Sequence, residues 1–556
     1  MKELFRRLSL QPLLAGELVV STLFITVLSL AAPLFVVQVL NRYVSSGFTG
    51  TLITLTIGML VAVGLQFVLR IIRTRLASQV SQRPDSNLSR RLMKVLTRAR
   101  MMPLNAVPRP SLQESVNSLQ MIRNAYNAAS ITAILDAPFA LFFIVATLWL
   151  SPLLALIALG GMILTLLVGG VALHYSRKVS EPLQNSTVAH RGQALSIINN
   201  VETVRLYRGE PFLQPIWEKQ IGVLGDLGQR DADIKEFNQS LSISLNILMT
   251  VLLYAVGAVQ VVNGELSVGG LIGANILAGR AYSSTSRFVQ TAYLLSRAGS
   301  AFKELGKLFR LPLESAKGTA IPKYSGSLEF NNVFFSYPRV PAALFERLSF
   351  KLAPGQTMVV VGFNGSGKTT LTRLIMGLLE PARGEIQVDG VNLRQIAPAW
   401  WRQQVGYLPQ EPTFLNCTIR EAITMAAADI DDVRLNEIVN LAGLRPFLDR
   451  SPKGLNGEVA NGGVELPLGI RRRLALARAL AVDGRLLVFD EPTEGLDEEG
   501  CQAVYRIMNN LVRAGKTIIV VSRDPKILKG ADLLLDLSVK PVPTLTRPNK
   551  GGGGLS

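Results

Sequence analysis

Six long apolar runs in the first half of the sequence limit the possible folds more than any other feature. An α-helix needs about 20 apolar residues to cross the hydrocarbon core of a bilayer. One such run could be a buried helix of a soluble protein, but six in succession predict a helical membrane domain. The first run is also too long for the core of a signal peptide. The runs cover residues 18–40, 51–69, 131–150, 153–173, 241–262 and, more weakly and with more glycine, 266–282.

The placement of positive charge predicts the orientation of these helices. The chain carries 58 Lys and Arg against 40 Asp and Glu, a net charge of +18. The basic residues gather in the first residues and in two long loops, about 70–130 and 175–238. Because positive loops stay on the cytoplasmic side, both termini and both long loops are expected in the cytoplasm. Much of the charge therefore reflects topology, and no nucleic-acid partner is expected.

The two long loops have the apolar spacing of helices, so we expect the membrane helices to continue into the cytoplasm. Turn signals interrupt this pattern in "NAVPRPSLQESVNS" and "YRGEPFLQPIWEK". These breaks are either short helices that dock on another domain or solvated turns. The predicted division is a membrane domain over 1–311, a linker over 312–326, an α/β P-loop nucleotide-binding domain over 327–545 and a flexible tail over 546–556.

The second half of the chain contains a P-loop. An apolar strand leads into "GFNGSGKTT", and a helical pattern follows. In this context backbone N–H groups and the helix N-terminus bind phosphates, the lysine reaches the β- and γ-phosphates, and the next hydroxyl ligates Mg²⁺. The cofactors expected are ATP and Mg²⁺. The candidate nucleotide-binding residues are Gly362, Asn364, Gly365, Ser366, Gly367, Lys368, Thr369 and Thr370, and Thr369 is also a candidate metal ligand.

A second apolar strand, "RLLVFDEP", supplies two carboxylates. Asp490 ends the apolar run and is expected to hold Mg²⁺ through water. Glu491 follows directly, where a carboxylate could act as a general base on the attacking water. An acidic turn without a catalytic role is the alternative interpretation.

Six membrane helices followed by these motifs resemble an ABC exporter half-transporter. The resemblance implies that Tyr337 of "FFSYP" stacks on adenine. It implies that Gln410 of "GYLPQEP" reaches the metal and the γ-phosphate. It also implies that Asp497 lies at a dimer interface and that the two loop breaks are coupling helices. Glu494 and Gly495 replace the Ser-Ala that the family usually has before Leu-Asp.

The membrane half is more specifically similar to type I protein-secretion ATPases. The phrases that carry this similarity are "APLFVVQVLNRYV", "ILDAPFALFF" and "LIGANILAGRAY". The resemblance implies polypeptide export from a bacterial inner membrane, with a periplasmic adaptor and an outer-membrane channel as partners. No peptidase-like domain precedes the first apolar run, so cleavage of a leader peptide is not expected.

Two family motifs are altered. The signature, usually Leu-Ser-Gly-Gly-Gln, is expected to complete the ATP site of the other cassette in a dimer, and "RRRLALARAL" fixes its register here. The serine position lacks a hydroxyl and an N–H, and a branched side chain stands at the first glycine position. The switch histidine is replaced by Arg523, which carries charge but cannot both donate and accept as neutral imidazole does. The signature positions are Leu466, Pro467, Leu468, Gly469 and Ile470.

These changes predict a chain that binds ATP and turns it over slowly on its own. A heterodimer with an intact second half-transporter is favoured, and a homodimer stays open. Because fold does not set substrate, export of a lipid, glycan or small molecule is an alternative. A non-transporting regulatory ATP-binding subunit is another. Arg280, within the sixth apolar run, either lines a substrate path or reaches the membrane edge.

Overall fold

The computed structural model forms two compact units. The membrane unit comprises the chain up to Ala99 together with Pro103–Leu311, and the ATP-binding unit comprises Arg100–Met102 and the chain from Pro312 onward. The predicted Gly-rich tail from residue 549 lies outside the described residues. The structure describes residues 2–548 except Ser46, Phe48, Ala316, Ala320, Arg339 and Pro341.

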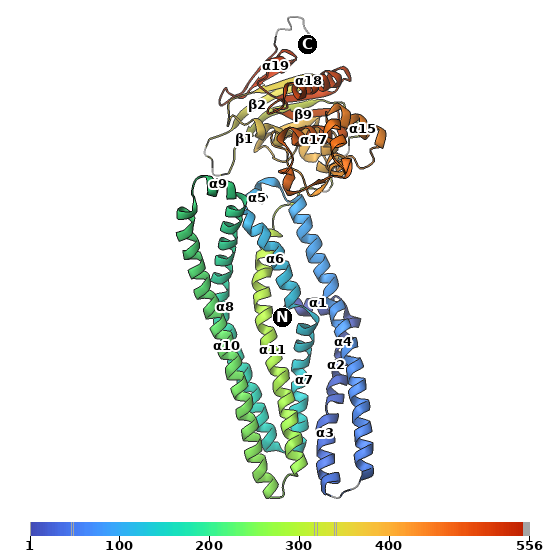
Figure 1. The fold of residues 1–556 in the computed structure, drawn as a ribbon, viewed down its shortest axis with the longest axis vertical. Helices are drawn as coiled ribbons and strands as arrows, with labels where there is room; N and C mark the ends of the chain where they lie inside the picture. Colours follow the sequence, from blue (N-terminus) through green and yellow to red (C-terminus); the bar gives the residue numbers. More distant parts are fainter. Residues whose placement is uncertain are drawn as a thin grey trace. The chain divides into compact units, whose positions relative to one another are not determined.

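The described part of the membrane unit consists of helices joined by short turns, and its long helices run alternately in opposite directions (Figure 1). Among the described residues, five segments are long and apolar enough to cross a membrane: Pro12–Val44, Thr49–Arg98, Ala128–Leu150, Pro152–Asn199 and Glu210–Val262. The helices are α1 (Lys2–Ser9), α2 (Pro12–Ser29), α3 (Ala31–Gln38), a π-helix (Val39–Val44), α4 (Thr49–Arg98), α5 (Met101–Asn105), α6 (Arg109–Ala125), α7 (Ala128–Leu150), α8 (Pro152–Asn199), α9 (Val201–Leu206), α10 (Glu210–Val262) and α11 (Val268–Leu308).

Helix α11 is the weak sixth run, and its packing explains its composition. Buried residues recur along its whole length, many of them Gly or Ala. A Cβ added at Gly273 would lie only 2.5 Å from Val37 of α3, and one at Gly269 only 2.8 Å from the Val37 carbonyl oxygen. Small residues allow membrane helices to approach closely without contacting lipid. A helix enclosed in this way needs less apolar surface than its neighbours.

Short helices occur near the two predicted loop breaks. Helix α4 ends at Arg98, and α5 precedes the Pro108 turn that begins α6. Helix α9 is followed by a turn at Tyr207–Gly209, after which α10 continues without interruption. Most of each quoted stretch is therefore helical, and the chain reverses over a few residues.

The described residues of the ATP-binding unit form three sheets. The largest has the strand order β12-β11-β3-β10-β9-β6 and is parallel except for β12. The second sheet is antiparallel with the order β2-β1-β4-β5, and β7 pairs with β8. The strands are β1 (Leu328–Phe335), β2 (Phe345–Leu352), β3 (Thr357–Val361), β4 (Arg383–Val388), β5 (Val391–Asn392), β6 (Val405–Leu408), β7 (Cys417–Thr418), β8 (Glu458–Val459), β9 (Leu486–Asp490), β10 (Thr517–Val521), β11 (Leu533–Asp536) and β12 (Thr544–Thr546).

The central strands are buried on both faces, which explains their continuous apolar sequences. Successive residues of a strand point to opposite faces of a sheet. Val359 and Phe489 belong to the core on one face, and Val360 and Val488 belong to the core on the other. The helices of this unit are α12 (Lys368–Ile375), α13 (Pro398–Gln403), α14 (Ile419–Thr424), α15 (Asp432–Leu441), α16 (Arg445–Arg450), α17 (Leu468–Ala481), α18 (Glu498–Arg513) and α19 (Pro525–Lys529), with 3-10 turns at Leu393–Gln395, Gly454–Asn456 and Asn461–Gly463.

Candidate functional site

The register of the large sheet places the candidate residues along one edge. Val521 of β10 pairs with Val360 of β3 on one side and with Asp490 of β9 on the other. The P-loop, the switch position and the acidic pair therefore leave three neighbouring strands at the same level. This is the carboxyl edge of the strands, where α/β sheets bind their ligands.

The P-loop turns tightly between β3 and α12, and its glycines are needed for that turn. Gly365 and Gly367 have φ values of +80° and +108°, in the left-handed region that favours glycine. A Cβ at Gly367 would also lie 2.7 Å from the Phe345 ring. Ser366 is fully buried, and its Oγ has no hydrogen-bond partner within the described part of the chain. The loop thus leads into the N-terminus of α12, where unpaired N–H groups favour an anion.

Lys368, the first residue of α12, lies between the P-loop and the acidic pair. Its Nζ donates to the Gly362 carbonyl oxygen at 3.2 Å and forms an ion pair with Glu491 Oε1 at 3.2 Å. The two side chains are only 14% and 17% exposed. The structure therefore brings the predicted phosphate-binding lysine and the predicted base together.

The acidic pair combines an enclosed carboxylate with a strained neighbour. Asp490 is 2% exposed, and its Oδ2 has no hydrogen-bond partner in the described residues. Burial, and then the charge of Glu491, raise the pKa of Asp490 to about 6, while Lys368 acts in the opposite direction. Glu491 has a φ of +49°, and its N–H donates to the Val521 carbonyl oxygen. Strain of roughly 1–3 kcal/mol at such a residue is common at functional sites.

Arg523, at the switch position, binds the P-loop backbone. Its Nε and Nη2 donate to the Gly362 carbonyl oxygen at 3.2 and 2.6 Å. Lys368 donates to the same oxygen, so this carbonyl accepts from two cationic side chains. Arg523 therefore stands beside the loop that is expected to bind phosphate.

Gln410 contacts Glu494, one of the two residues that replace the Ser-Ala usual in the family. Its Nε2 donates to Glu494 Oε2 at 3.1 Å, and the same oxygen pairs with Arg472 of α17 at 3.5 Å. Arg472 is largely buried, and its Nε and Nη1 have no hydrogen-bond partner within the described residues. The replacement at Glu494 thus links the Gln410 loop to α17, the helix that begins at the signature positions.

Tyr337 lies beside the P-loop helix. Its hydroxyl is 3.0 Å from Thr370 Oγ1, and its ring packs edge-on against Phe335 at 5.1 Å. The structure therefore brings Tyr337 to the predicted nucleotide-binding residues.

Lys540 was missed by sequence reasoning because no motif marks it. Its Nζ donates to the Ser366 carbonyl oxygen at 2.8 Å and to that of Leu344 at 2.6 Å. Burial lowers the pKa of Lys540. A lysine shortly after β11, the last parallel strand of the large sheet, would have been the only signal.

The signature positions form the start of α17. Pro467 is the N-cap residue, with no side-chain cap, and its carbonyl accepts from Arg471. Pro467 and Leu468 are exposed, whereas Leu466 and Ile470 pack against the core. Open space surrounds Gly469. The two replaced positions therefore point outward, and the two apolar ones anchor the segment.

Asp497 caps the next helix, α18. Its carboxylate accepts from the Gly500 N–H at 2.9 Å and pairs with Arg473 at 3.1 Å. The Gly500 hydrogen bond, and then the Arg473 charge, lower the pKa of Asp497. The side chain remains 66% exposed.

Two protein-family models match the chain, one in each unit. The model described as "ABC transporter transmembrane region" matches residues 16–282, and the model described as "ABC transporter" matches residues 345–494. The chain belongs to the ABC transporters. Its membrane region is fused to an ATP-binding domain, which confirms the fold class expected from the sequence.

The relatives are named for the export of protein toxins. The chain is 28% identical to the toxin RTX-I translocation ATP-binding protein of Actinobacillus pleuropneumoniae, over 93% of this chain and 73% of the relative. It is 28% identical to the alpha-hemolysin translocation ATP-binding protein HlyB of Escherichia coli O157:H7, over 93% of this chain and 74% of the relative. Both similarities support the expected resemblance to secretion ATPases.

A solved structure shares the fold. It is described as a bacterial Atm1-family ABC exporter with ATP bound, and it superposes with a TM-score of 0.83. The match covers 95% of this chain and 94% of the other at 19% identity. The chain is therefore an ATP-driven exporter by fold and family.

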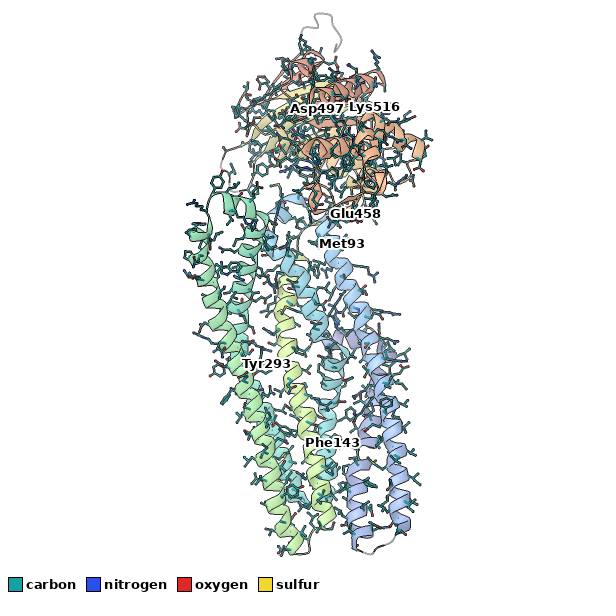
Figure 2. All side chains as sticks on the ribbon, viewed as in Figure 1. Met93, Phe143, Tyr293, Glu458, Asp497 and Lys516 are labelled. Carbon is teal, nitrogen blue, oxygen red and sulfur yellow. The ribbon has the colours of Figure 1, made fainter. Side chains whose placement is uncertain are left out.

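The membrane unit contains a cavity of about 550 Å³ between α10 and α11. Its walls carry many uncharged hydrogen-bonding groups, among them Asn238, Asn246, Gln290 and Tyr293. Figure 2 marks Tyr293 on α11. Neither the side-chain amide oxygen of Asn238 (Oδ1) nor the Tyr293 hydroxyl has a hydrogen-bond partner within the described residues. This cavity offers both donors and acceptors to a polar ligand.

Proposed function

We propose that the chain exports a polypeptide in a type I secretion-like system, as the catalytically altered half of a dimer. The observation that carries the proposal is the cavity between α10 and α11. Its amides and hydroxyls suit the repeated N–H and C=O groups of an unfolded backbone, whatever the side chains. The toxin-export names of the relatives support the same substrate class. A periplasmic adaptor and an outer-membrane channel are the partners such a system requires.

The expected orientation follows from charge. Both long loops and the first residues are basic, so the termini and the ATP-binding unit are placed in the cytoplasm of a bacterium, with the helices in its inner membrane.

The residues at the carboxyl edge fit ATP with Mg²⁺. The Thr369 hydroxyl is exposed at the start of α12, and the buried Asp490 carboxylate has an oxygen that receives no hydrogen bond from the described residues. Hydroxyl and carboxylate oxygens are ligands that Mg²⁺ prefers. When bound, the ion would neutralise phosphate charge. Lys368 would hold the terminal phosphates, Glu491 would orient and polarise water, and Gln410 would have to exchange Glu494 for the nucleotide.

The proposal that the chain is the catalytically altered half of a dimer rests on the start of α17. At Pro467 no side-chain hydroxyl and no N–H can reach a phosphate on a second cassette, and Leu468 exposes 44% of its surface there. Loss of one donor to developing charge typically lowers a rate by about 10²–10³. We therefore propose slow turnover alone and a heterodimer with an intact half-transporter, with a homodimer as the alternative.

The test is a set of repairs. Arg523→His acts on the ATP of this chain's own P-loop, and Pro467→Ser with Leu468→Gly acts on the partner's ATP. In a heterodimer the two gains in ATPase activity should be roughly additive. In a homodimer both defects meet at each site, and the repairs should be synergistic. If no repair raises activity in any assembly, the proposal of an altered ATPase is wrong.

A regulatory subunit without transport activity is the second candidate, because the same outward-facing Pro467 and Leu468 would suit a cassette that only binds ATP. Export of polypeptide cargo into proteoliposomes separates the two. Cargo movement that requires Lys368 supports the exporter, whereas ATP binding without movement of any cargo in any assembly supports the regulatory role.

A further inference from the structure

The membrane unit holds a second cavity whose walls are strongly basic. It has a volume of about 220 Å³ and lies between α2, α4, α7 and α11. Four arginines line it, Arg70 and Arg73 from α4 and Arg280 and Arg287 from α11, against a single carboxylate, Asp136. Its net charge is therefore +3, from four positive charges and one negative charge. Charges at such positions in membrane helices usually mark functional paths.

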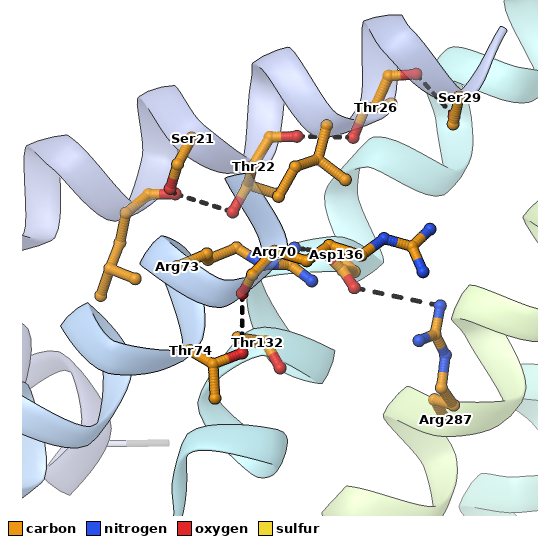
Figure 3. A network of polar contacts seen from close by, with 12 residues as sticks. Ser21, Thr22, Thr26, Ser29, Arg70, Arg73, Thr74, Thr132, Asp136 and Arg287 are labelled. Carbon is orange, nitrogen blue, oxygen red and sulfur yellow. Dashed lines mark hydrogen bonds and ion pairs between the residues drawn. The ribbon is translucent and has the colours of Figure 1, made fainter. Parts of the chain in front are cut away.

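Part of this cavity already binds a carboxylate. Asp136 of α7 receives Arg73 Nη1 at 2.5 Å, and Arg287 Nη2 lies 3.9 Å away (Figure 3). Asp136 thus stands between one arginine of α4 and one of α11. Arg73 and Asp136 are 11% and 15% exposed, so this pairing is largely shielded from solvent.

The second pair of arginines repeats the first without an acid. Helices α4 and α11 run in the same direction (Figure 1). Arg70 precedes Arg73 by about 4.5 Å of helix rise, and Arg280 precedes Arg287 by about 10.5 Å. Arg70 and Arg280 therefore lie on the same side of Asp136, and both line the same cavity. Within the described chain, the structure gives neither guanidinium a hydrogen-bond or ion-pair partner.

Most of the other polar groups of the cavity already donate hydrogen bonds. The Thr26 hydroxyl donates to the Thr22 carbonyl, that of Ser29 donates to the Thr26 carbonyl, and that of Thr74 donates to the Arg70 carbonyl (Figure 3). The Ser283 hydroxyl likewise donates to a backbone carbonyl of its own helix. The free groups are therefore mainly guanidinium N–H donors, with the hydroxyl of Ser284 beside them. A ligand here must accept hydrogen bonds and carry negative charge, as a carboxylate does.

We propose that Arg70 and Arg280 bind the acidic side chains, Asp or Glu, of the exported polypeptide. This inference rests on the proposed function and names the segments that the exporter recognises. Arg73–Asp136–Arg287 shows the geometry: a carboxylate held between an α4 arginine and an α11 arginine. Arg70, Ser283 and Arg287 are exposed, so the cavity is open on one side.

The test measures binding of a labelled ten-residue peptide of alternating Glu and Gly to the full chain in a neutral detergent. The variant Arg70→Gln with Arg280→Gln should weaken binding by roughly tenfold or more, because two charge-assisted contacts are lost. Arg75→Gln, an exposed α4 position outside the cavity, is the matched control and should have no effect. A Gln-Gly peptide should bind weakly to every variant.

Three outcomes would overturn the inference. The first is equal affinity for the Glu and Gln peptides. The second is unchanged Glu-peptide binding in the double variant. The third is binding of short-chain phosphatidylglycerol, without any peptide binding, that depends on the same arginines, since the site would then take a lipid phosphate.

Folding and the underlying function are controlled separately. ATP binding, which uses the other unit, should be unchanged in the double variant, and Arg70→Lys with Arg280→Lys should retain part of the peptide affinity. If a polypeptide cargo is exported but replacing its acidic residues has no effect, the inference fails and the proposed function stands. If no polypeptide moves while the Glu peptide still binds through these arginines, the proposed function fails instead.

Discussion

Replacing Glu494 by serine should raise ATP turnover by releasing Gln410. In the structure Gln410 Nε2 donates to the Glu494 carboxylate at 3.1 Å. A hydrogen bond to a charged group contributes roughly 1.5–3 kcal/mol when enclosed. The Glu494 side chain is 53% exposed, so solvent reduces this to about 1 kcal/mol. Since 1.4 kcal/mol is tenfold, the population of released Gln410 should rise about fivefold.

The assay is phosphate release by the full chain in lipid, alongside ATP affinity. Glu494→Ser should increase turnover by roughly three- to fivefold if Gln410 must leave this contact before it reaches the nucleotide. Glu494→Gln keeps an acceptor for Gln410 and should produce a smaller increase. Glu498→Ser, an exposed acidic position at the start of α18, is the matched control. In the Gln410→Ala background, Glu494→Ser should have no effect.

Two results would refute this reasoning. Turnover and ATP affinity that are both unchanged in Glu494→Ser would show that the contact does not restrain Gln410. An equal gain from Glu494→Ser in the Gln410→Ala background would show that the carboxylate acts through another group, of which Arg472 is the nearest candidate.

Three further predictions concern the P-loop and its supports. Lys368→Ala should abolish ATP binding, measured by equilibrium titration. If the variant and the wild type bind ATP with comparable affinity, this loop is excluded as the site. For Asp490, the folded pKa of about 6 lies above the ordinary 3.8, so its contribution to stability is present below about pH 4 and is lost as pH rises through 6. Asp490→Asn should therefore be more stable than wild type at pH 7.5, with a free energy of unfolding larger by at most about 3 kcal/mol. The difference should vanish near pH 4. A difference that stays constant with pH would contradict this. Lys540→Met should weaken ATP affinity several-fold because the Ser366 and Leu344 carbonyls lose a cationic donor, and Lys540→Arg should restore part of it.

Sequence patterns predicted the elements whose local chemistry is distinctive. The P-loop, the strand ending at Asp490 and five of the apolar runs have clear periods and turn residues. Helix α11 is harder to recognise because its glycines serve contacts with Val37, and only the packed structure shows that neighbour. The weak hydropathy of α11 reflects its burial by other helices and not a shorter membrane-spanning segment.

The contacts among the site residues could not be predicted in the same way. Gln410 and Glu494 are separated by 84 positions, and their meeting depends on the order of β6 and β9 in the sheet. The basic cavity could not be predicted either, because Arg70 and Arg280 come from helices far apart in the sequence. Charge alone identified Arg280 as a candidate, but its place in one cavity with Arg70 depends on the packing of both α4 and α11 against α7.

The groups expected to bind the terminal phosphate share one property: each is bonded to the protein in the structure. Lys368 contacts Glu491 and the Gly362 carbonyl, Arg523 contacts the same carbonyl, and Gln410 contacts Glu494. ATP would have to replace all of these bonds, so its net affinity is the difference between two sets of contacts and not the sum of the new ones. This exchange would account for the slow turnover of bound ATP that we propose for the chain. The contacts within the chain oppose the rearrangement of Gln410 and Arg523, and the outward-facing Pro467 and Leu468 give little in return to the second cassette.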